Sequence, residues 1–188
     1  MSSTCIPTQT QTRLPGPTPN SNYLLEDRIL FGWYVTDPAS SGNYSNNVDL
    51  LIKTNRDVFI NLTTSAERQG FYDYIPRVKS QIPDAMFLSF EIPDCGIPQD
   101  LTSFTKFILE LKGLFDQGKK LFIHCRGGHG RSGLVTACLL ISMNWTAENA
   151  LFEVKMSHLS RMYYPEYPCP QTEEQVEFVK NFENVLDV

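Results

Sequence analysis

The feature that most constrains this chain is a glycine-rich segment that lies between two different hydrophobic patterns. Residues 120 to 124 form a short apolar run typical of a buried strand, and residues 133 to 143 follow a helical pattern. Between them lies His-Cys-Arg-Gly-Gly-His-Gly-Arg-Ser-Gly, residues 124 to 133. A strand that passes through a glycine-rich loop into a helix can direct several backbone N–H groups at one point. The segment therefore predicts a binding site for a phosphate-sized anion.

Short apolar runs alternate with helical patterns along the rest of the chain. This alternation predicts an α/β fold: a central, mainly parallel, twisted sheet of about four to five strands, helices on both faces and a helical C-terminal part. Ligands bind such a sheet beyond the carboxyl ends of its strands. The expected strands are residues 29–35, 58–62, 86–92 and 120–124, and the expected helices are residues 48–53, 101–115, 133–143, 147–159 and 173–186.

Length and composition predict a single folded domain with a tail. The chain has 188 residues, of which 41% are hydrophobic and 20% charged, values typical of a globular protein with one substantial core. Residues 1–22 are rich in Thr, Ser, Gln, Asn and Pro, a composition that indicates a flexible N-terminal tail. Residues 23–188 are then expected to form one domain.

The net charge and the pattern of apolar residues indicate which partners and which cellular location to expect. The chain has a net charge of −5, whereas nucleic-acid-binding proteins typically carry an excess of basic residues. No nucleic-acid partner is therefore expected. No apolar run approaches the roughly 20 residues that a membrane span requires, and no secretory signal is visible. The five scattered cysteines are expected as reduced thiols. These features predict a cytoplasmic protein, with a nuclear location also open, and they leave the oligomeric state unpredicted.

Within the glycine-rich loop, Cys125 is the candidate nucleophile. Converging N–H dipoles and the start of the following helix favour its thiolate, the form that attacks phosphorus. Arg131 is expected to fold back over the loop, where its planar fork can hold two oxygens of a transferring phosphoryl group. The glycines permit the positive φ angles and close backbone approach that such a loop requires. The expected phosphate-binding residues are Arg126, Gly127, Gly128, His129, Gly130 and Arg131.

This chemistry calls for no metal ion and no cofactor. A loose phosphoryl-transfer transition state needs in-line positioning and charge stabilisation, which the loop can supply. Cys125 and His129 share one tight loop without further ligands at zinc spacing. No lysine follows the last glycine, so the loop differs from an ATP-binding loop.

The segment HCRGGHGRSG resembles the Cys-x5-Arg-Ser/Thr signature of the protein tyrosine and dual-specificity phosphatase superfamily. The resemblance implies a phosphatase fold, a cysteinyl-phosphate intermediate on Cys125, and a Ser132 hydroxyl that helps the sulfur leave. Two further segments resemble family loops in order and spacing. Residues 92–98 resemble the mobile general-acid loop, and residues 170–178 resemble the glutamine loop. With these, the resemblance covers most of residues 24–186.

The general-acid segment contains one strong candidate. Asp94 would protonate the leaving oxygen and later accept a proton from the attacking water. A turn residue in a Pro/Gly loop is the alternative interpretation of Asp94. Asp100 is the nearby competitor, but its place directly before an apolar-periodic helix indicates an N-cap.

Three residues are expected to support catalysis from other positions. In the glutamine loop of the family the first glutamine, here Gln171, orients the hydrolytic water. Gln175 is a second candidate, although Thr172-x-x-Gln175 is also typical of a capping box at the start of the last helix. His124, at the end of a strand, is expected to brace the loop through hydrogen bonds.

The resemblance favours a small dual-specificity phosphatase acting on phosphotyrosine, and on phosphoserine or phosphothreonine, in proteins. Arg126 and His129 occupy positions where lipid-phosphate phosphatases of the superfamily carry lysines. A phosphoinositide, inositol-phosphate or RNA 5′-phosphatase therefore remains an alternative. A catalytically silent phosphoprotein-binding module would be expected to lack the nucleophile, the arginine or the acid. A sulfur-transfer or arsenate-reducing enzyme would not call for Asp94 and Gln171.

Two aromatic clusters have two possible interpretations: they could form a rim around the substrate, or they could pack within the fold. One lies at residues 71–75, and the other lies at residues 162–167, directly before the glutamine loop.

Overall fold

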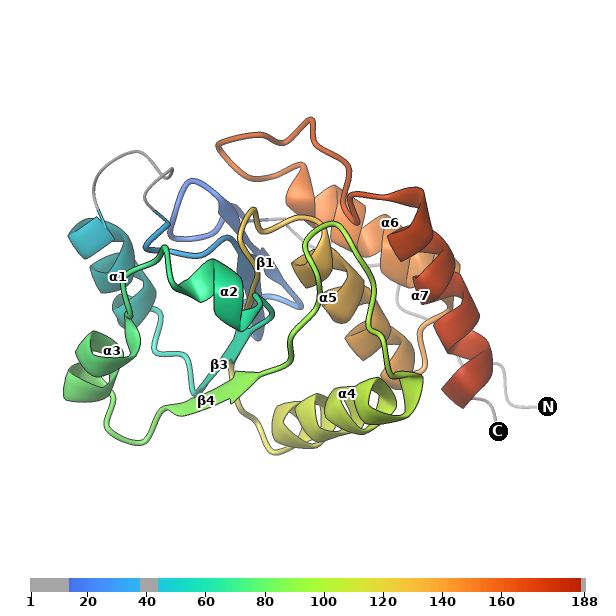
Figure 1. The fold of residues 1–188 in the computed structure, drawn as a ribbon, viewed down its shortest axis with the longest axis horizontal. Helices are drawn as coiled ribbons and strands as arrows, with labels where there is room; N and C mark the ends of the chain where they lie inside the picture. Colours follow the sequence, from blue (N-terminus) through green and yellow to red (C-terminus); the bar gives the residue numbers. More distant parts are fainter. Residues whose placement is uncertain (1–13, 38–43, 187–188) are drawn as a thin grey trace.

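The computed structural model describes residues 14–37 and 44–186, and its centre is a five-stranded sheet with the strand order β1-β2-β5-β3-β4 (Figure 1). β1 pairs antiparallel with β2, whereas the β2–β5, β5–β3 and β3–β4 pairs are parallel. The predicted mainly parallel α/β sheet is therefore confirmed. The strands are β1 (Ser21–Leu24), β2 (Ile29–Gly32), β3 (Val58–Asn61), β4 (Met86–Ser89) and β5 (Leu121–His124).

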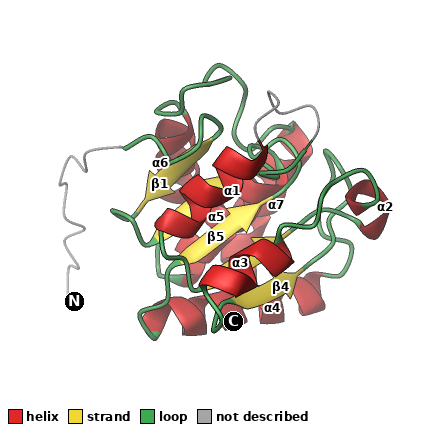
Figure 2. Cartoon of the chain, turned by 90° about the vertical axis from the view of Figure 1, so that its left-hand side faces the viewer, coloured by secondary structure: helices red, strands yellow, loops and turns green. Residues whose placement is uncertain are grey.

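Helices cover both faces of the sheet, as Figures 1 and 2 show. Successive strand residues point to opposite faces, so Leu30 and Phe122 pack in the cluster beneath α1 and α3. Phe31 and Ile123 pack in the larger cluster with α4, α5, α6 and α7. The helices are α1 (Tyr44–Lys53), α2 (Ser65–Arg68), α3 (Ile75–Gln81), α4 (Leu101–Asp116), α5 (Arg131–Ser142), α6 (Ala147–His158) and α7 (Glu173–Leu186).

Helix α5 is the centre of the larger layer. Every residue from Arg131 to Ser142 is buried, because α4, α6 and α7 surround the helix and the sheet lies behind it. Its sequence, rich in Leu, Val and Ala, accordingly lacks a polar face. The start of this helix is thus held on all sides, which fixes the loop that precedes it.

The N-terminal segment differs from the prediction of a tail through residue 22. β1 begins at Ser21, and the Gly16 and Tyr23 N–H groups donate to the carbonyls of Ser21 and Leu14. Asn20 and Asn22 are fully buried. The domain boundary expected at residue 23 is therefore wrong, because a polar composition does not exclude a segment whose backbone is hydrogen-bonded. Residues 1–13 lie outside the described residues.

Several element boundaries also differ from the prediction. α1 begins at residue 44 and not 48, β2 ends at residue 32 and not 35, and α5 begins at residue 131 and not 133. Helices α2 and α3 were not predicted, because their four and seven residues are too short to show a helical period. No helix within the described ranges is long and apolar enough to cross a bilayer.

Candidate active site

The glycine-rich loop lies at the carboxyl end of β5, between the strand and α5, as predicted. Cys125 directly follows β5 and is 2% exposed. The N–H of Gly128 donates to Cys125 Sγ over 3.2 Å, and Ser132 Oγ lies 3.6 Å from the same sulfur. The structure thus brings the candidate nucleophile, one loop amide and the Ser132 hydroxyl together. Both contacts would stabilise a thiolate.

Among the loop glycines, Gly128 is the one that requires glycine for its conformation. Its φ is +76°, and an added Cβ would lie 2.3 Å from the backbone of Gly32 and Trp33. Gly127 and Gly130 have no positive φ, so of these three glycines Gly128 alone uses that conformational freedom. At Gly130 an added Cβ would instead meet Gln171 Oε1 at 3.0 Å.

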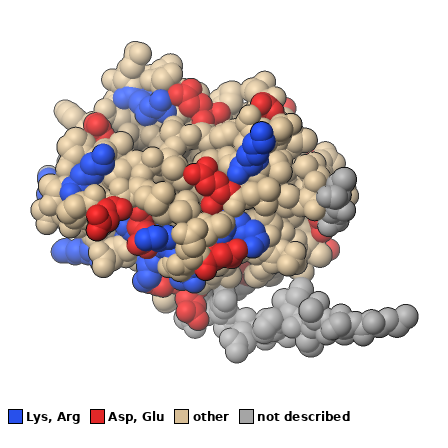
Figure 3. Space-filling model, turned by 90° about the horizontal axis from the view of Figure 1, so that it is seen from below, with Lys and Arg blue, Asp and Glu red and all other residues tan. Residues whose placement is uncertain are grey.

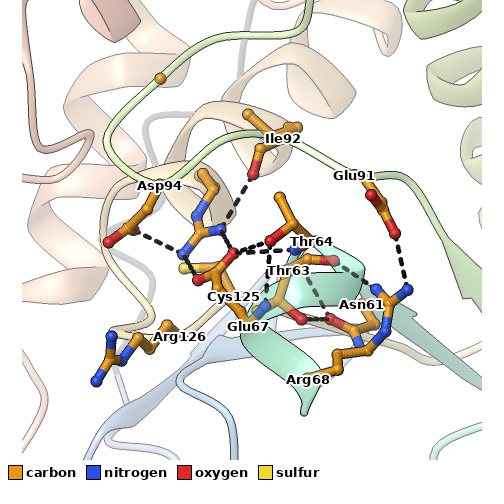
Figure 4. Close-up of polar contacts among 12 residues, drawn as sticks. Asn61, Thr63, Thr64, Glu67, Arg68, Glu91, Ile92, Asp94, Cys125 and Arg126 are labelled. Carbon is orange, nitrogen blue, oxygen red and sulfur yellow. Dashed lines mark hydrogen bonds and ion pairs between the residues drawn. The ribbon is translucent and has the colours of Figure 1, made fainter. Parts of the chain in front are cut away.

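Arg131 is held by a carboxylate that the sequence analysis did not single out. Its Nη1 and Nη2 atoms each donate to one oxygen of Glu67 over 2.8 Å, and Nη1 also donates to the carbonyl of Ile92 over 3.1 Å. Arg131 is 1% exposed. A bidentate pair of this kind fixes the plane of the guanidinium. Figure 4 shows Glu67 and Ile92 on two sides of the site.

The local sequence explains why Glu67 reaches the site. Thr64 and Glu67 form a capping box at the start of α2, directly after β3. Burial raises the pKa of Glu67, but hydrogen bonds from Arg131 and Thr64 outweigh burial and lower it to about 2. Glu67 is therefore a carboxylate throughout the neutral range. In the sequence, Thr64-x-x-Glu67 directly after the predicted strand of residues 58–62 was the signal for this capping box and could have pointed to Glu67.

Asp94 lies on the open side of the arginine. Its Oδ1 accepts from Arg131 Nη2 over 2.7 Å, and the side chain is 56% exposed (Figure 4). Asp100 does not take this place. Its carboxylate accepts from the N–H groups of Thr102 and Ser103, which confirms the predicted N-cap of α4.

His124 is a buried structural residue. Its Nε2 lies 2.7 Å from Tyr74 Oη, and burial lowers its pKa to about 3, so the ring is neutral. Tyr74 itself is buried against Tyr34 and Phe59. Of the aromatic cluster at residues 71–75, Tyr74 therefore belongs to the core, whereas Tyr72 is 66% exposed.

Two side chains of the loop, His129 and Arg126, could carry positive charge. His129 is neutral, and Arg126 is paired with a carboxylate. Burial, followed by the charge of Arg161, lowers the pKa of His129, so its ring is neutral at pH 7. The ring stacks on Tyr167, with centroids 5.3 Å apart and planes at 13°. The guanidinium of Arg126 is half-exposed, and its Nε lies 3.3 Å from Asp37 Oδ2.

Residues 170–178, the candidate glutamine loop, lie against two other loops. One is the glycine-rich segment of residues 124–133, called the phosphate loop from here on, and the other is the candidate acid loop of residues 92–98. Gln175 is buried, and its Oε1 accepts from the N–H groups of Gln171 and Thr172. Its backbone N–H donates to the hydroxyl oxygen of Thr172 over 3.2 Å, which confirms the capping box. Its Nε2 donates to the carbonyl of Gly96 over 2.9 Å. Gln175 therefore positions Gln171 and also joins α7 to the segment after Asp94.

Cysteines and metal ligands complete the description of the site. Cys95, Cys125, Cys138 and Cys169 have free thiols, and Cys5 lies outside the described residues. Within residues 14–37 and 44–186, no three His, Cys, Asp or Glu side chains gather so as to hold a metal ion.

Comparisons with known proteins agree on one family. Residues 40–167 match the family described as "PTP-SAK: Swiss Army Knife protein, DSP-PTPase phosphatase domain". "Putative tyrosine phosphatase 067L" of Invertebrate iridescent virus 3 is 32% identical over 164 residues, which are 80% of this chain and 64% of that protein. "Putative tyrosine phosphatase 197R" of Invertebrate iridescent virus 6 is 34% identical over 168 residues, 87% and 53% respectively. The chain thus spans about half to two thirds of these relatives.

The fold also matches solved structures. The crystal structure of Tk-PTP in the active form superposes with a TM-score of 0.65 at 23% identity, covering 88% of this chain and 97% of that one. At this identity the likeness concerns the fold.

Proposed function

This chain belongs to the DSP-PTPase phosphatase family, and we propose that it hydrolyses phosphate monoesters in proteins through a cysteinyl-phosphate on Cys125. Phosphotyrosine is the proposed main substrate, with phosphoserine and phosphothreonine also accepted. The carrying observation is the convergence on one buried sulfur: the Gly128 amide at 3.2 Å, the Ser132 hydroxyl at 3.6 Å, and Arg131 at the start of α5.

The first half of the reaction forms a sulfur–phosphorus bond. The Cys125 thiolate attacks phosphorus, the bond between phosphorus and the ester oxygen breaks, and Asp94 gives its proton to that oxygen. A phosphoryl oxygen takes over the Arg131 Nη2 donor that Asp94 holds in the free protein. Asp94 is thereby released toward the leaving group, and its 56% exposure leaves room for this movement.

The second half regenerates the thiolate. A water oxygen attacks phosphorus, its proton passes to the Asp94 carboxylate, and the sulfur–phosphorus bond breaks. The Ser132 hydroxyl stabilises the departing sulfur, and Gln171 orients the water. Gln175 supports this step by holding the Gln171 backbone.

The surroundings of the loop support a peptide substrate. Tyr167 stacks on His129 and is 46% exposed, so an aromatic surface borders the phosphate loop. A polyanionic inositol phosphate would find less extra charge, because His129 is neutral and Arg126 is paired with Asp37. The face shown in Figure 3, which is seen from below the view of Figure 1, has basic and acidic side chains interspersed. The four cysteines in the described part of the chain have free thiols, which suits a reducing compartment, the cytoplasm or the nucleus.

Hydrolysis of a small aryl phosphate tests the reaction. Cys125→Ser should lose turnover by roughly 10⁴-fold or more, since the nucleophile is removed. Cys138→Ala, which removes a buried thiol on α5, should retain turnover. Orthovanadate should inhibit the parent protein. A Cys125→Ser protein with parental turnover would overturn the mechanism.

A substrate panel tests the proposed class. Phosphotyrosine peptides, phosphoserine and phosphothreonine peptides, vesicles containing a phosphoinositide, soluble inositol phosphates and a 5′-phosphorylated RNA should be compared by kcat/KM. Faster turnover of the lipid, the inositol phosphate or the RNA than of every phosphopeptide would reject the protein substrate.

A further inference from the structure

A second buried arginine lies behind the phosphate loop. Arg161 follows α6, is 4% exposed, and its Nη2 donates to the Gly128 carbonyl over 2.9 Å. Its Nε and Nη2 donate to Asn22 Oδ1 over 3.1 and 2.7 Å. The peptide that contains the Gly128 carbonyl is thus held from behind. The N–H of the same residue faces Cys125 Sγ.

Among the residues that the structure describes, no carboxylate offsets the charge of Arg161. Arg131 contacts both Glu67 and Asp94, but within the described ranges no Asp or Glu side chain forms an ion pair with Arg161. Burial lowers the pKa of Arg161 to about 10, while Cys169 and Cys125 act in the opposite direction. The guanidinium is therefore protonated at neutral pH, and its charge acts on Cys125.

The other titratable groups around Cys125 supply little net positive charge. His124 and His129 are neutral, and burial raises the pKa of Cys169 to about 12, so its thiol stays protonated. The remaining charges are paired. Arg131 is shared between Glu67 and Asp94, and Arg126 contacts Asp37.

We propose that Arg161 is a positioning residue that stabilises the Cys125 thiolate from behind the phosphate loop. It holds the Gly128 peptide, so that the amide points at the sulfur, and it supplies a buried positive charge that no described carboxylate offsets. In a partly desolvated site such a charge favours the ionised sulfur. The inference rests on the proposed role of Cys125 as nucleophile.

Asn22 offers a test that leaves Arg161 in place. Its Oδ1 accepts two N–H groups of Arg161, whereas its buried Nδ2 has no partner within the described part of the chain. Asn22→Asp therefore keeps the shape and both hydrogen bonds, loses no bond at Nδ2, and places a negative charge on the guanidinium. A purely structural Arg161 would be held at least as well by this variant.

The measurement is the rate of Cys125 alkylation by iodoacetamide against pH, followed on the Cys125 peptide by mass spectrometry. On the acidic limb, near pH 6, the rate in Asn22→Asp should fall roughly tenfold. At high pH, where the thiol is ionised in both proteins, the rates should be equal. An Asn22→Asp protein with the parental profile and parental melting temperature would overturn the proposal.

Substitutions of Arg161 separate its charge from its hydrogen bonds. Arg161→Met should show the same acidic-limb loss as Asn22→Asp, and Arg161→Lys should restore most of the alkylation rate while kcat stays low, because an ammonium cannot reproduce the fork. If Arg161→Met does not fold, Asn22→Asp and Arg161→Lys still decide. An Arg161→Lys profile as impaired as that of Asn22→Asp would contradict the role of charge.

Arg56→Met is the matched control. Arg56 is another buried arginine, 1% exposed, but it contacts Thr54 and Asp27 at the amino-terminal edge of the sheet. Its loss should lower the melting temperature and leave the alkylation profile unchanged. Because alkylation reports the thiol and not turnover, a failed proposed function would appear in the Cys125→Ser assay, whereas a failed role of Arg161 would appear only here.

Discussion

The two arginines at the front and at the back of the phosphate loop, Arg131 and Arg161, have partners of opposite kinds: carboxylates at the front and neutral groups at the back. At the front, Arg131 is shared between Glu67, which is nearly buried, and Asp94, which is 56% exposed. At the back, Arg161 is bound by the neutral groups of Asn22 and Gly128. The front thus carries excess negative charge before substrate arrives, and the back carries a positive charge that no described carboxylate pairs with.

The difference indicates separate tasks for the two arginines. In the proposed reaction a phosphoryl group enters at the front, so one partner of Arg131 has to be exchangeable, and the exposed Asp94 meets that requirement. Glu67 is fixed by its capping box and keeps the fork oriented while Asp94 leaves. The back has no such exchange, because Arg161 is buried and contacts only the fold itself.

The largest expected effect comes from removing the exchangeable partner. Asp94→Asn should slow aryl phosphate turnover by roughly 10² to 10⁴-fold and abolish the basic limb of the pH profile, because no group remains to protonate the leaving oxygen. Affinity for orthovanadate should rise, since the anion no longer displaces a carboxylate from Arg131. Steady-state kinetics and inhibitor titration measure both.

Asp100→Asn is the control for this experiment. It removes the cap of α4 and should lower stability while leaving the pH profile in place. A basic limb that persists in Asp94→Asn and vanishes in Asp100→Asn would reverse the assignment.

A smaller effect is expected from the fixed partner. Glu67→Gln should reduce kcat/KM roughly ten- to hundredfold, because a charge-assisted bidentate pair that orients Arg131 is replaced by a weaker contact. Orthovanadate affinity should fall, opposite to Asp94→Asn. Glu91→Gln, which removes the exposed partner of Arg68, provides the matched control and should behave as the parent. Equal vanadate affinity in Glu67→Gln and Glu91→Gln would contradict the positioning role.

The smallest effect concerns stability against pH. The pKa of Glu67 is lowered from 4.5 to about 2 in the folded protein, so its stabilising contribution is complete above pH 4.5 and is lost as the pH falls toward 2. The free energy of unfolding of Glu67→Gln should therefore lie roughly 1 to 2 kcal/mol below that of the parent at pH 7, with the gap closing in acid. Denaturant titrations at pH 7 and pH 3 measure it, and a gap that widens in acid would reject this linkage.

Local pattern predicted the mainly parallel sheet and the loop that carries Cys125 and Arg131, but it did not predict β1, α2 or α3. The strand, the glycine-rich loop and the following helix are contiguous in sequence, so Cys125, Ser132 and Arg131 could be placed from spacing alone. The capping roles of Asp100 and Thr172 were predictable for the same reason, because a cap acts within one turn of its helix. The alternation of apolar runs similarly predicted the strands β2, β3, β4 and β5.

Contacts between distant segments could not be predicted in this way. Glu67 and Arg131 are 64 residues apart, and Asn22 and Arg161 are 139 apart. The cluster that contains Tyr74 could not be assigned to a substrate rim or to ordinary packing, because its hydrogen-bond partner His124 lies 50 residues away in the sequence. The N-terminal boundary failed through composition, since polar residues such as Asn20 and Asn22 occupy a buried strand region.

The hydrogen bond between Asn22 and Arg161 also bears on how the protein is made. Asn22 is synthesised 139 residues before Arg161, so the loop cannot be fully assembled until the segment that contains Arg161 has been synthesised. Contacts of such long sequence separation form late and slowly during folding. In the nascent chain, Cys125 would thus lack the surroundings that favour its thiolate, and it would become reactive only when the fold is complete.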